Sequence, residues 1–208
     1  MIAPLTDAQH IWRREQRERL LDHRRLMPSA ERRSLGDKVI ANLDRVIAGR
    51  DVAVLGIYWP IKREIDLLPW AAALAARRPV TLALPVVTTP KTPLDYCLWR
   101  AGDPMTRGFW NIPEPAARIP VLPDVVIAPL VGFCGFWRLG YGGGYFDRTL
   151  AARPVRPFAF GIGFEVYETP DFTPAAHDIF MNSIVTERRI MSSADDASLK
   201  KSSMIQTG

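Results

Sequence analysis

Four glycines fall within seven consecutive residues of the segment 138–148, which reads Arg-Leu-Gly-Tyr-Gly-Gly-Gly-Tyr-Phe-Asp-Arg. Because glycine has no Cβ, such a backbone can take positive φ and turn several N–H groups toward one point, where they bind an anion. The flanking Arg138 and Arg148 carry forked cations suited to phosphate oxygens, and Asp147 adds a hard oxygen ligand of the kind that holds a magnesium ion on a nucleotide. The segment therefore predicts a phosphate site. A flexible surface loop is the less favoured alternative, because charged residues frame the glycines.

General nucleotide motifs do not explain this segment. No Gly-Lys-Ser/Thr follows the glycines, so it is not a P-loop, and Tyr145 stands where the dinucleotide-binding motif needs its last glycine. A second set of cations precedes it in the chain. Arg13, Arg17 and Arg24 are spaced i, i+4 and i+11, so they share one face of a helix. Spacing alone favours a solvated face for them.

The elements that would position these residues alternate along the chain. Thr6 and Gln9 form a capping box for a helix that we expect to end near residue 26, and Ser29 can cap a second helix to about residue 47. Asp66 could cap a helix over 67–78, and the glycine segment leads into a helix over 145–152. Strands are predicted at 52–59, 80–87, 95–99, 125–131, 158–164 and 184–186. Residues 102–123 read as a long ordered loop.

This alternation predicts an α/β fold, a three-layer α/β/α sandwich with a mostly parallel, Rossmann-like sheet. One domain is expected over residues 1–191, followed by a disordered, small and polar tail over 192–208. The glycine segment follows the apolar run 125–131, which resembles a central parallel strand. Ligands of such sheets bind beyond the carboxyl ends of the strands, and the glycine segment lies at that position.

Composition narrows the function classes. The 208 residues are 48% hydrophobic and 24% charged, and they show neither a membrane-spanning run nor a secretory signal. Two cysteines, Cys97 and Cys134, make no disulfide framework, so we expect a cytoplasmic protein. A net charge of +5 suits an anionic partner. Because no nucleic-acid motif accompanies it, phosphorylated or carboxylated small molecules are favoured over RNA or DNA.

Six segments in the same order resemble the motifs of the 5-formyltetrahydrofolate cyclo-ligase family. The resemblance covers about residues 10–190. Besides 138–148, the matching segments are Arg13-x-x-x-Arg17, Tyr58-Trp59-Pro60 with Glu64-Ile65-Asp66, Trp110-Asn111-Ile112-Pro113-Glu114-Pro115, residues 123–130, and His177-Asp178 with Thr186-Glu187.

The resemblance implies a reaction and two small-molecule substrates, ATP and a reduced folate. The family uses ATP with Mg²⁺ to phosphorylate the formyl oxygen of 5-formyltetrahydrofolate. N10 then attacks the activated carbon and phosphate leaves, which gives 5,10-methenyltetrahydrofolate and ADP. Such phosphoryl transfer needs positioning and charge neutralisation more than a protein nucleophile. No nucleic acid or membrane partner is implied, and we expect a monomer, with a dimer left open.

The resemblance also implies residue roles. Arg138, Tyr145 and Asp147 would be catalytic, and Asp147 and Asp178 would be the metal ligands. Those that would bind ATP are Arg13, Arg17, Arg138, Gly140, Tyr141, Gly142, Gly143, Gly144, Tyr145 and Phe146. Those that would bind the folate are Tyr58, Trp59, Glu64, Trp110, Tyr141 and Tyr145.

Simpler interpretations stand beside these roles. Glu64 could accept paired hydrogen bonds from the pterin or form a salt bridge with Lys62 or Arg63. Tyr58 and Trp59 could form the pterin wall or pack in the core at the end of a strand. Asp147 could be a first-turn helix carboxylate and Asp178 a turn residue.

Three residues depart from the family pattern, namely Phe146, Cys134 and Asn182. At Phe146 the family usually has tyrosine, at Cys134 an expected aspartate is missing, and Asn182 replaces another. Each removes a polar group, which leaves open a paralogue that binds nucleotide or folate without this activity.

Overall fold

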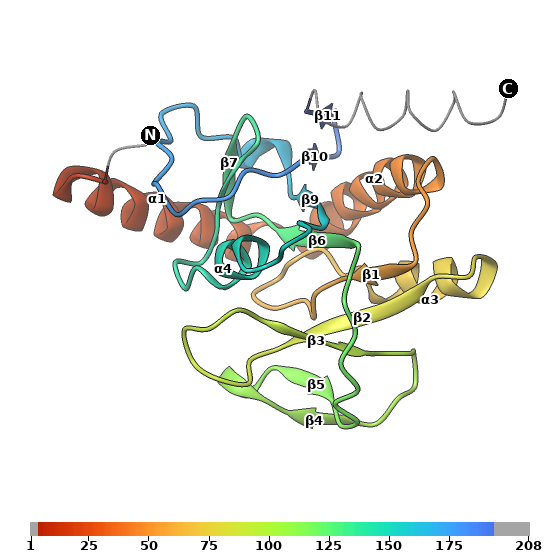
Figure 1. The fold of residues 1–208 in the computed structure, drawn as a ribbon. Helices are drawn as coiled ribbons and strands as arrows, with labels where there is room; N and C mark the ends of the chain where they lie inside the picture. Colours follow the sequence, from red (N-terminus) through yellow and green to blue (C-terminus); the bar gives the residue numbers. More distant parts are fainter. Residues whose placement is uncertain (1–3, 194–208) are drawn as a thin grey trace, which may run out of the picture.

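Seven strands form one sheet in the order β11-β10-β9-β6-β1-β2-β3 in the computed structural model, which describes residues 4–193 (Figure 1). The five inner strands are parallel, and the edge strands β3 and β11 are antiparallel to their neighbours. The bounds are β1 Val54–Gly56, β2 Thr81–Val86, β3 Asp95–Leu98, β6 Val125–Pro129, β9 Phe158–Ile162, β10 Ser183–Val185 and β11 Ile190–Ser192. The predicted α/β class, the mostly parallel sheet and the central position of 125–131 are confirmed.

Both faces of the inner strands are buried, which explains their continuous apolar sequences. Alternate side chains of β6 point to opposite sides: Ile127 packs in the large core under the helices, whereas Val126 and Ala128 pack in two smaller clusters. Strand β9 follows the same rule, with Phe160 in the large core and Ala159 on the opposite side.

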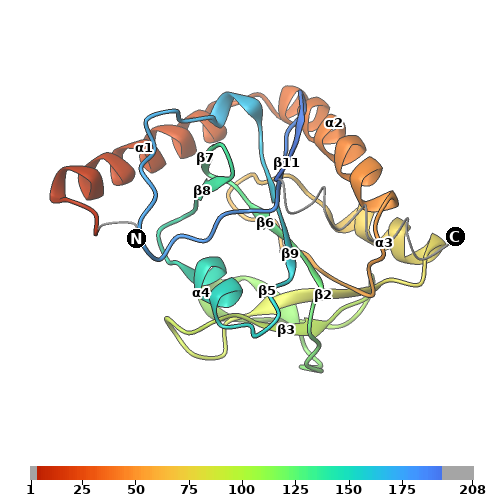
Figure 2. The same ribbon diagram turned by 45° about the horizontal axis from the view of Figure 1, so that its top comes forward.

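The helices divide between the two faces of the sheet. Helices α2 (Ser29–Ala48) and α3 (Leu68–Arg77) cover one face, and α4 (Tyr145–Ala151) lies on the other (Figure 2). Helix α1 (Asp7–Leu26) runs past the carboxyl ends of the strands, where it contacts β7. The expected three layers are present, and α1 is additionally placed to reach the carboxyl edge of the sheet.

Local sequence signals predicted most of the helix ends correctly. Thr6 and Gln9 form the predicted capping box, and α1 ends at Leu26 as expected. Asp66 accepts a hydrogen bond from the backbone N–H of Leu68 (3.0 Å), although Leu67 occupies the cap position of α3. The prediction that Ser29 caps α2 is wrong, because Pro28 is the cap residue and Ser29 is already helical.

The predicted loop over 102–123 is wrong, because it contains the hairpin of β4 (Met105–Arg107) and β5 (Pro113–Pro115), with the short 3₁₀ turn η1 (Phe109–Asn111) at its tip. The backbone N–H of Gly108 donates to the carbonyl oxygen of Ile112, and that of Ala116 donates to Pro104. Hydrogen-bonded and non-hydrogen-bonded residue pairs alternate in an antiparallel hairpin, so both prolines of β5 belong to pairs that exchange no hydrogen bond. Proline is tolerated at such positions.

A second hairpin, β7 (Gly132–Cys134) with β8 (Trp137–Leu139), was also not predicted, and it places Arg138 on a strand. Strand β11 includes Ser192, one residue beyond the expected domain boundary. The predicted disorder of the tail otherwise lies outside the described residues. Within residues 4–193 both cysteines are free thiols, and no helix is long and apolar enough to cross a membrane.

Substituting Gly56 by alanine is expected to destabilise the fold by about 2 kcal/mol and to lower Tm by roughly 4–8 °C. A Cβ on Gly56 would lie 2.8 Å from the ring of Tyr96 and 3.0 Å from that of Pro123, and rigid rings cannot yield as a flexible side chain would. Thermal unfolding followed by circular dichroism measures the shift. The matched control is Gly36→Ala on α2, where the nearest atom is at 3.7 Å and alanine should raise Tm slightly. Equal Tm values for Gly56→Ala and the wild type would contradict the packing argument.

Candidate active site

A cleft of about 660 Å³ opens beyond the carboxyl ends of β1 and β6. The chain passes from β1 to β2 on one side and later places β6 on the other, so the strand order reverses between β1 and β6. Ligands of open α/β sheets bind at such a point. The volume is in the usual range for small-molecule sites. Every residue to which the family resemblance assigned a role lines this cleft, from Arg13 on α1 to Asp178 near the carboxyl terminus.

The glycine segment lies across the cleft between β8 and α4. Gly142 and Gly144 have φ of 94° and 65°, which are left-handed values that favour glycine. The Nε of Arg17 donates to the carbonyl oxygen of Gly140 (2.8 Å), so α1 and the segment are joined. A Cβ on Gly140 would lie 2.2 Å from a nitrogen of Arg138, so a larger residue there would displace that guanidinium.

Arg138 and Asp147 form a buried ion pair in the cleft wall. A terminal nitrogen of Arg138 donates to Asp147 Oδ2 at 2.7 Å, and Asp147 Oδ1 accepts from the backbone N–H of Ile179 at 3.2 Å. The guanidinium lies 5.3 Å from the centre of the Phe146 ring. Both residues are less than one-tenth exposed. The strand β8 and the first turn of α4 therefore hold one cation and one carboxylate together at the cleft.

A second buried pair joins Arg13 to Asp178. Arg13 also donates to the carbonyl oxygen of Thr173 (2.9 Å), and Asp178 accepts from the backbone N–H of Ala175 (2.7 Å). Burial lowers the pKa of Arg17, and the charges of Arg13 and Arg138 lower it further, although Asp178 opposes them. Three guanidinium groups face two carboxylates, so this half of the cleft has an excess of positive charge that favours an anion.

Buried arginine N–H groups in this half of the cleft also have no acceptor among the described residues. The Nε atoms of Arg13 and Arg138 are buried and have no hydrogen-bond partner within residues 4–193. An unpaired buried donor costs about 1–3 kcal/mol. A bound anion whose oxygens reach these groups would remove that cost.

Glu64 lies in the other half of the cleft, at the end of a tight turn after β1. Its backbone N–H donates to the carbonyl oxygen of Ile61 (2.9 Å), and its carboxylate accepts from the N–H of Ile61 (2.8 Å). The two central residues, Lys62 and Arg63, have φ of 46° and 60°, which is unusual for residues with a side chain. The turn thus fixes Glu64 at the cleft in a conformation with some backbone strain.

The Glu64 carboxylate has no salt bridge to Lys62 or Arg63 among the ion pairs of the described residues; it accepts from the Tyr141 hydroxyl at 2.7 Å. Burial raises the pKa of Glu64 to about 7, although the hydrogen bonds from Ile61 and Tyr141 and the charges of Arg24 and Lys62 oppose that rise. Glu64 therefore titrates near neutral pH.

Aromatic rings form the walls beside Glu64. Tyr58 is buried and donates its hydroxyl hydrogen bond to the carbonyl oxygen of Ile65 (2.7 Å), while Trp59 is half-buried. Trp110, at the tip of the β4–β5 hairpin, is 61% exposed with φ of 54°. Its ring meets the Tyr145 ring edge to face at 5.3 Å. The cleft thus has flat apolar surfaces suited to a flat ligand.

Tyr145 connects the glycine segment to the loop between β2 and β3. Its hydroxyl oxygen accepts from the backbone N–H of Lys91 (3.1 Å), which leaves the hydroxyl proton available to donate. The ring also lies 5.0 Å from the Arg148 guanidinium. Contacts from Lys91, Trp110 and Arg148 therefore hold Tyr145 in place at the cleft.

Two aspartates of the cleft offer oxygen ligands of the kind that magnesium takes. Asp147 and Asp178 line the same cleft, and the Asp147 carboxylate accepts from the residue that follows Asp178. Within residues 4–193 no group of three His, Cys, Asp or Glu side chains could hold a metal ion by itself. Magnesium usually takes one or two carboxylates together with phosphate oxygens and water. The two aspartates therefore fit an ion that arrives on a nucleotide.

The three residues that depart from the family pattern lie in different parts of the structure. Phe146 lines the cleft, beneath Arg138. Cys134 does not line it, and its sulfur faces the carbonyl oxygen of Pro170. Asn182 accepts from the backbone N–H of Ala159 (2.9 Å) and helps to join the sheet. One departure of the three thus concerns the cleft.

Sequence reasoning did not assign a role to Arg24, although it placed Arg24 on the face of Arg13 and Arg17. In the structure Arg24 is 3% exposed and donates to the Tyr141 hydroxyl (3.0 Å), which in turn donates to Glu64. The signal that could have identified it is the spacing of i+11 from Arg13, which is close to three full helical turns.

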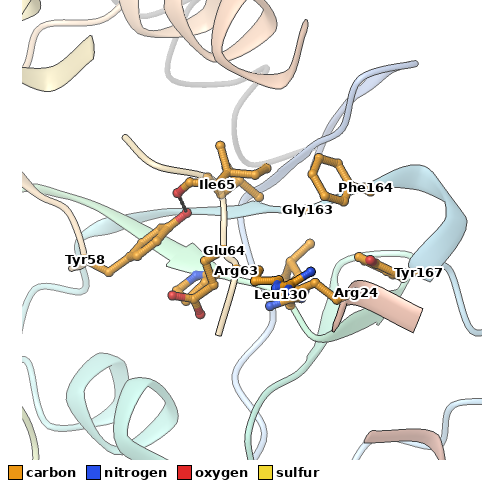
Figure 3. Close-up of a pocket in the computed structure, with 11 residues that line it drawn as sticks. Arg24, Tyr58, Arg63, Glu64, Ile65, Leu130, Gly163, Phe164 and Tyr167 are labelled. Carbon is orange, nitrogen blue, oxygen red and sulfur yellow. Dashed lines mark hydrogen bonds between the residues drawn. The ribbon is translucent and has the colours of Figure 1, made fainter. Parts of the chain in front are cut away.

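Figure 3 shows Arg24 and Glu64 together beside a recess of about 10 Å³, the size of a single water molecule. The recess adjoins the cleft, because Tyr58, Glu64 and Pro129 line both. Its remaining wall includes Leu130, whose carbonyl oxygen accepts a hydrogen bond from Arg24.

Comparisons with known proteins agree on one family. Residues 9–187 match the sequence profile of the 5-formyltetrahydrofolate cyclo-ligase family. The NMR structure of 5,10-methenyltetrahydrofolate synthetase from Aquifex aeolicus is 28% identical and superposes with a TM-score of 0.74 over 86% of this chain and 92% of that one. The 5,10-methenyltetrahydrofolate synthetase of Mycoplasma pneumoniae is 21% identical, with a TM-score of 0.66 over 84% and 98% of the two chains, and it supports the fold alone. No curated protein matches the sequence.

Proposed function

Because the chain belongs to the 5-formyltetrahydrofolate cyclo-ligase family, we propose that it uses ATP to convert 5-formyltetrahydrofolate to 5,10-methenyltetrahydrofolate, with ADP and phosphate as the other products. The observation that carries the proposal is that one cleft has two unlike halves. One half is rich in arginine and contains two aspartates, and the other combines Glu64 with flat aromatic walls. A phosphate donor and a flat heterocycle can thus lie next to each other.

In the first step the formyl oxygen attacks the γ-phosphorus and ADP leaves. Arg13, Arg17 and Arg138 orient the phosphates and neutralise their charge, which is the main protein contribution to phosphoryl transfer. Asp147 and Asp178 would hold a Mg²⁺ ion, which would supply positive charge to neutralise the transferring phosphate. The buried pairs of these aspartates with Arg138 and Arg13 keep both carboxylates in place.

In the second step N10 attacks the phosphorylated formyl carbon and loses its proton, the C–O bond to phosphate breaks, and the ring closes. Glu64 orients the pterin by accepting two hydrogen bonds, and the rings of Tyr58 and Trp59 face its flat surface. Trp110 and Tyr145 cover the other side and exclude water from the reactive phosphorylated intermediate.

The direct test mixes the protein with 5-formyltetrahydrofolate, Mg²⁺ and ATP and follows the methenyl product by absorbance. We expect product formation that requires ATP, with one ADP released for each methenyl group. The control omits ATP, or replaces it by an analogue whose γ-phosphate cannot be transferred. The proposal is wrong if enzyme equimolar with substrate makes no ATP-dependent product, although separate titrations show that both ligands bind.

A further inference from the structure

We propose that Arg24 is a positioning residue, whose buried guanidinium acts through the Tyr141 hydroxyl to keep the Glu64 carboxylate ionised and oriented for the folate. The inference rests on the proposed function, in which Glu64 binds the pterin. Arg24 itself faces the recess beside the cleft and does not line the cleft. Its influence on the substrate is therefore indirect.

Three distant parts of the chain meet in this relay. Arg24 comes from the last turns of α1, Tyr141 from the glycine segment and Glu64 from the turn after β1. A terminal nitrogen of Arg24 donates to the Tyr141 oxygen at 3.0 Å, and the Tyr141 hydroxyl donates to Glu64 Oε1 at 2.7 Å. The Tyr141 proton is thus directed at Glu64, because its oxygen is already occupied as an acceptor of Arg24.

Among residues 4–193, the charge of Arg24 has no closer counterion than Glu64 through an ion pair or a chain of hydrogen bonds. Within the described part of the chain Arg24 takes part in no direct ion pair, and its other terminal nitrogen donates to the carbonyl oxygen of Leu130. A buried cation needs a compensating negative charge. Glu64, reached through one hydroxyl group, can supply it while it is ionised.

Other groups around Glu64 cannot replace Arg24. The titratable or charged side chains that face Glu64 or share its recess are Arg24, Tyr58, Lys62, Arg63, Tyr141 and Tyr167. Burial raises the pKa of Tyr58 and Tyr141, so both remain neutral hydroxyl groups near pH 7. Lys62 and Arg63 are exposed, so water and salt screen their charges. Arg24 is the buried cation of this set.

The consequence concerns the pH range in which the folate binds. A neutral Glu64 carboxyl would carry a proton on an oxygen that must accept from the pterin. Removing the charge of Arg24 favours that neutral form, so Glu64 would take up its proton at a higher pH. Because Glu64 has a pKa of about 7 in the wild type, a rise of about one unit would lower its ionised fraction at pH 7 about fivefold.

The first arm of the test needs no substrate. The side-chain carboxyl carbon of Glu64 is followed by NMR in ¹³C-glutamate-labelled protein from pH 5 to 9, and its signal is assigned by its loss in Glu64→Gln. We expect the titration midpoint to rise by about one pH unit in Arg24→Met. Arg24→Lys keeps the charge and should restore most of the wild-type midpoint. Arg63→Met, the same change at an exposed neighbour, should leave the midpoint within about 0.3 unit.

The second arm measures kcat/KM for 5-formyltetrahydrofolate against pH at saturating ATP. The acid limb of the wild-type profile should move upward in Arg24→Met by the same interval as the NMR midpoint. A purely structural role for Arg24 would change Tm or the height of the profile without moving this limb. If Arg24→Met does not fold, Tyr141→Phe carries the same test, because it removes the hydrogen bond to Glu64 and leaves the charge of Arg24 in place.

The outcomes separate this inference from the proposed function. An unchanged Glu64 midpoint in Arg24→Met, or in Tyr141→Phe if that variant must be used, overturns the inference even if the wild type is an active cyclo-ligase. A raised midpoint in a wild-type protein that makes no product supports the relay and counts against the proposed function alone.

Discussion

Replacing Arg138 by methionine is expected to lower kcat of the ATP-dependent reaction about 1,000-fold, with a change of less than about threefold in the affinity for folate. Arg138 is 6% exposed and faces the cleft between the Phe146 ring and Asp147. Its buried Nε has no partner among the described residues, so a phosphate oxygen can accept that hydrogen bond. Charge that develops on the transferred phosphoryl group would then lose a fixed, buried cation.

Whether the loss of activity in Arg138→Met appears in kcat or in KM for ATP decides the role of Arg138. A cation that binds the transition state more strongly than the ground state lowers kcat when it is removed, whereas one that binds both equally raises KM for ATP. Initial rates at varied ATP and fixed, saturating folate measure the two constants. Folate binding is measured separately by calorimetry in the absence of ATP.

Stability must be measured beside activity, because Arg138→Met leaves Asp147 buried without its partner. Breaking such a pair from one side costs about 3–5 kcal/mol. Arg138→Lys keeps the charge without the fork and should lose less activity and less stability than methionine does. Arg45→Met, at an exposed arginine of α2 outside the cleft, controls for the loss of one positive charge from the protein. A folded Arg138→Met protein with kcat within tenfold of wild type would contradict the assigned role.

The parts of the fold that sequence predicted are those that local rules determine. The capping box at Thr6 and Gln9 is complete within four residues, so the start of α1 could be located. The run 125–131 is apolar without a break because both faces of β6 are buried, and this placed the central strand. Both features depend on little outside their own segments.

The hairpins were not predicted because their stability depends on pairing between short strands. Each strand of the β4–β5 and β7–β8 hairpins has three residues, which is too short for periodicity to distinguish strand from loop. The prolines at 113 and 115 favoured a loop in isolation. Only the register of the pair shows that neither proline has to donate a hydrogen bond.

The candidate site likewise combines features that local sequence predicts with features that depend on distant parts of the chain. The glycine segment was identified from its own composition, whereas Arg13 and Arg17 of α1 gained a role only through the family resemblance, and the cleft brings both together. The environment of Glu64 could not be derived in this way. Its neighbours in sequence, Lys62 and Arg63, suggested a salt bridge, yet its partner Tyr141 is 77 residues away, and Tyr141 in turn meets Arg24 across 117 residues. Partners so distant in sequence are determined by the topology of the sheet.

Replacing Glu64 by glutamine is expected to raise KM for 5-formyltetrahydrofolate about 100-fold at pH 8, with little change in the affinity for ATP. The two side chains have almost the same shape, but the amide offers a donor where the carboxylate offers an acceptor. Two hydrogen bonds to a charged acceptor contribute about 3 kcal/mol together, which corresponds to the expected factor. Steady-state kinetics for the folate and calorimetry for ATP measure the two effects. Equal KM values for variant and wild type would exclude Glu64 from pterin binding.

The same substitution is expected to stabilise the protein at alkaline pH, which distinguishes lost binding from lost folding. The pKa of Glu64 is about 7 in the folded protein, against an ordinary value of 4.5 for a solvated glutamate. The folded state therefore binds more protons than the unfolded state between these values, and the wild type loses stability as pH rises through this window. Since burial of the charge is the main cause, glutamine removes a cost of about 2 kcal/mol above pH 7, allowing for partial exposure of the group. Urea unfolding at pH 5 and pH 8 should show near-equal stabilities at the lower pH and a more stable Glu64→Gln protein at the higher one. A variant that is less stable than wild type at pH 8 would mean that the hydrogen bonds from Ile61 and Tyr141 outweigh the cost of burying the carboxylate.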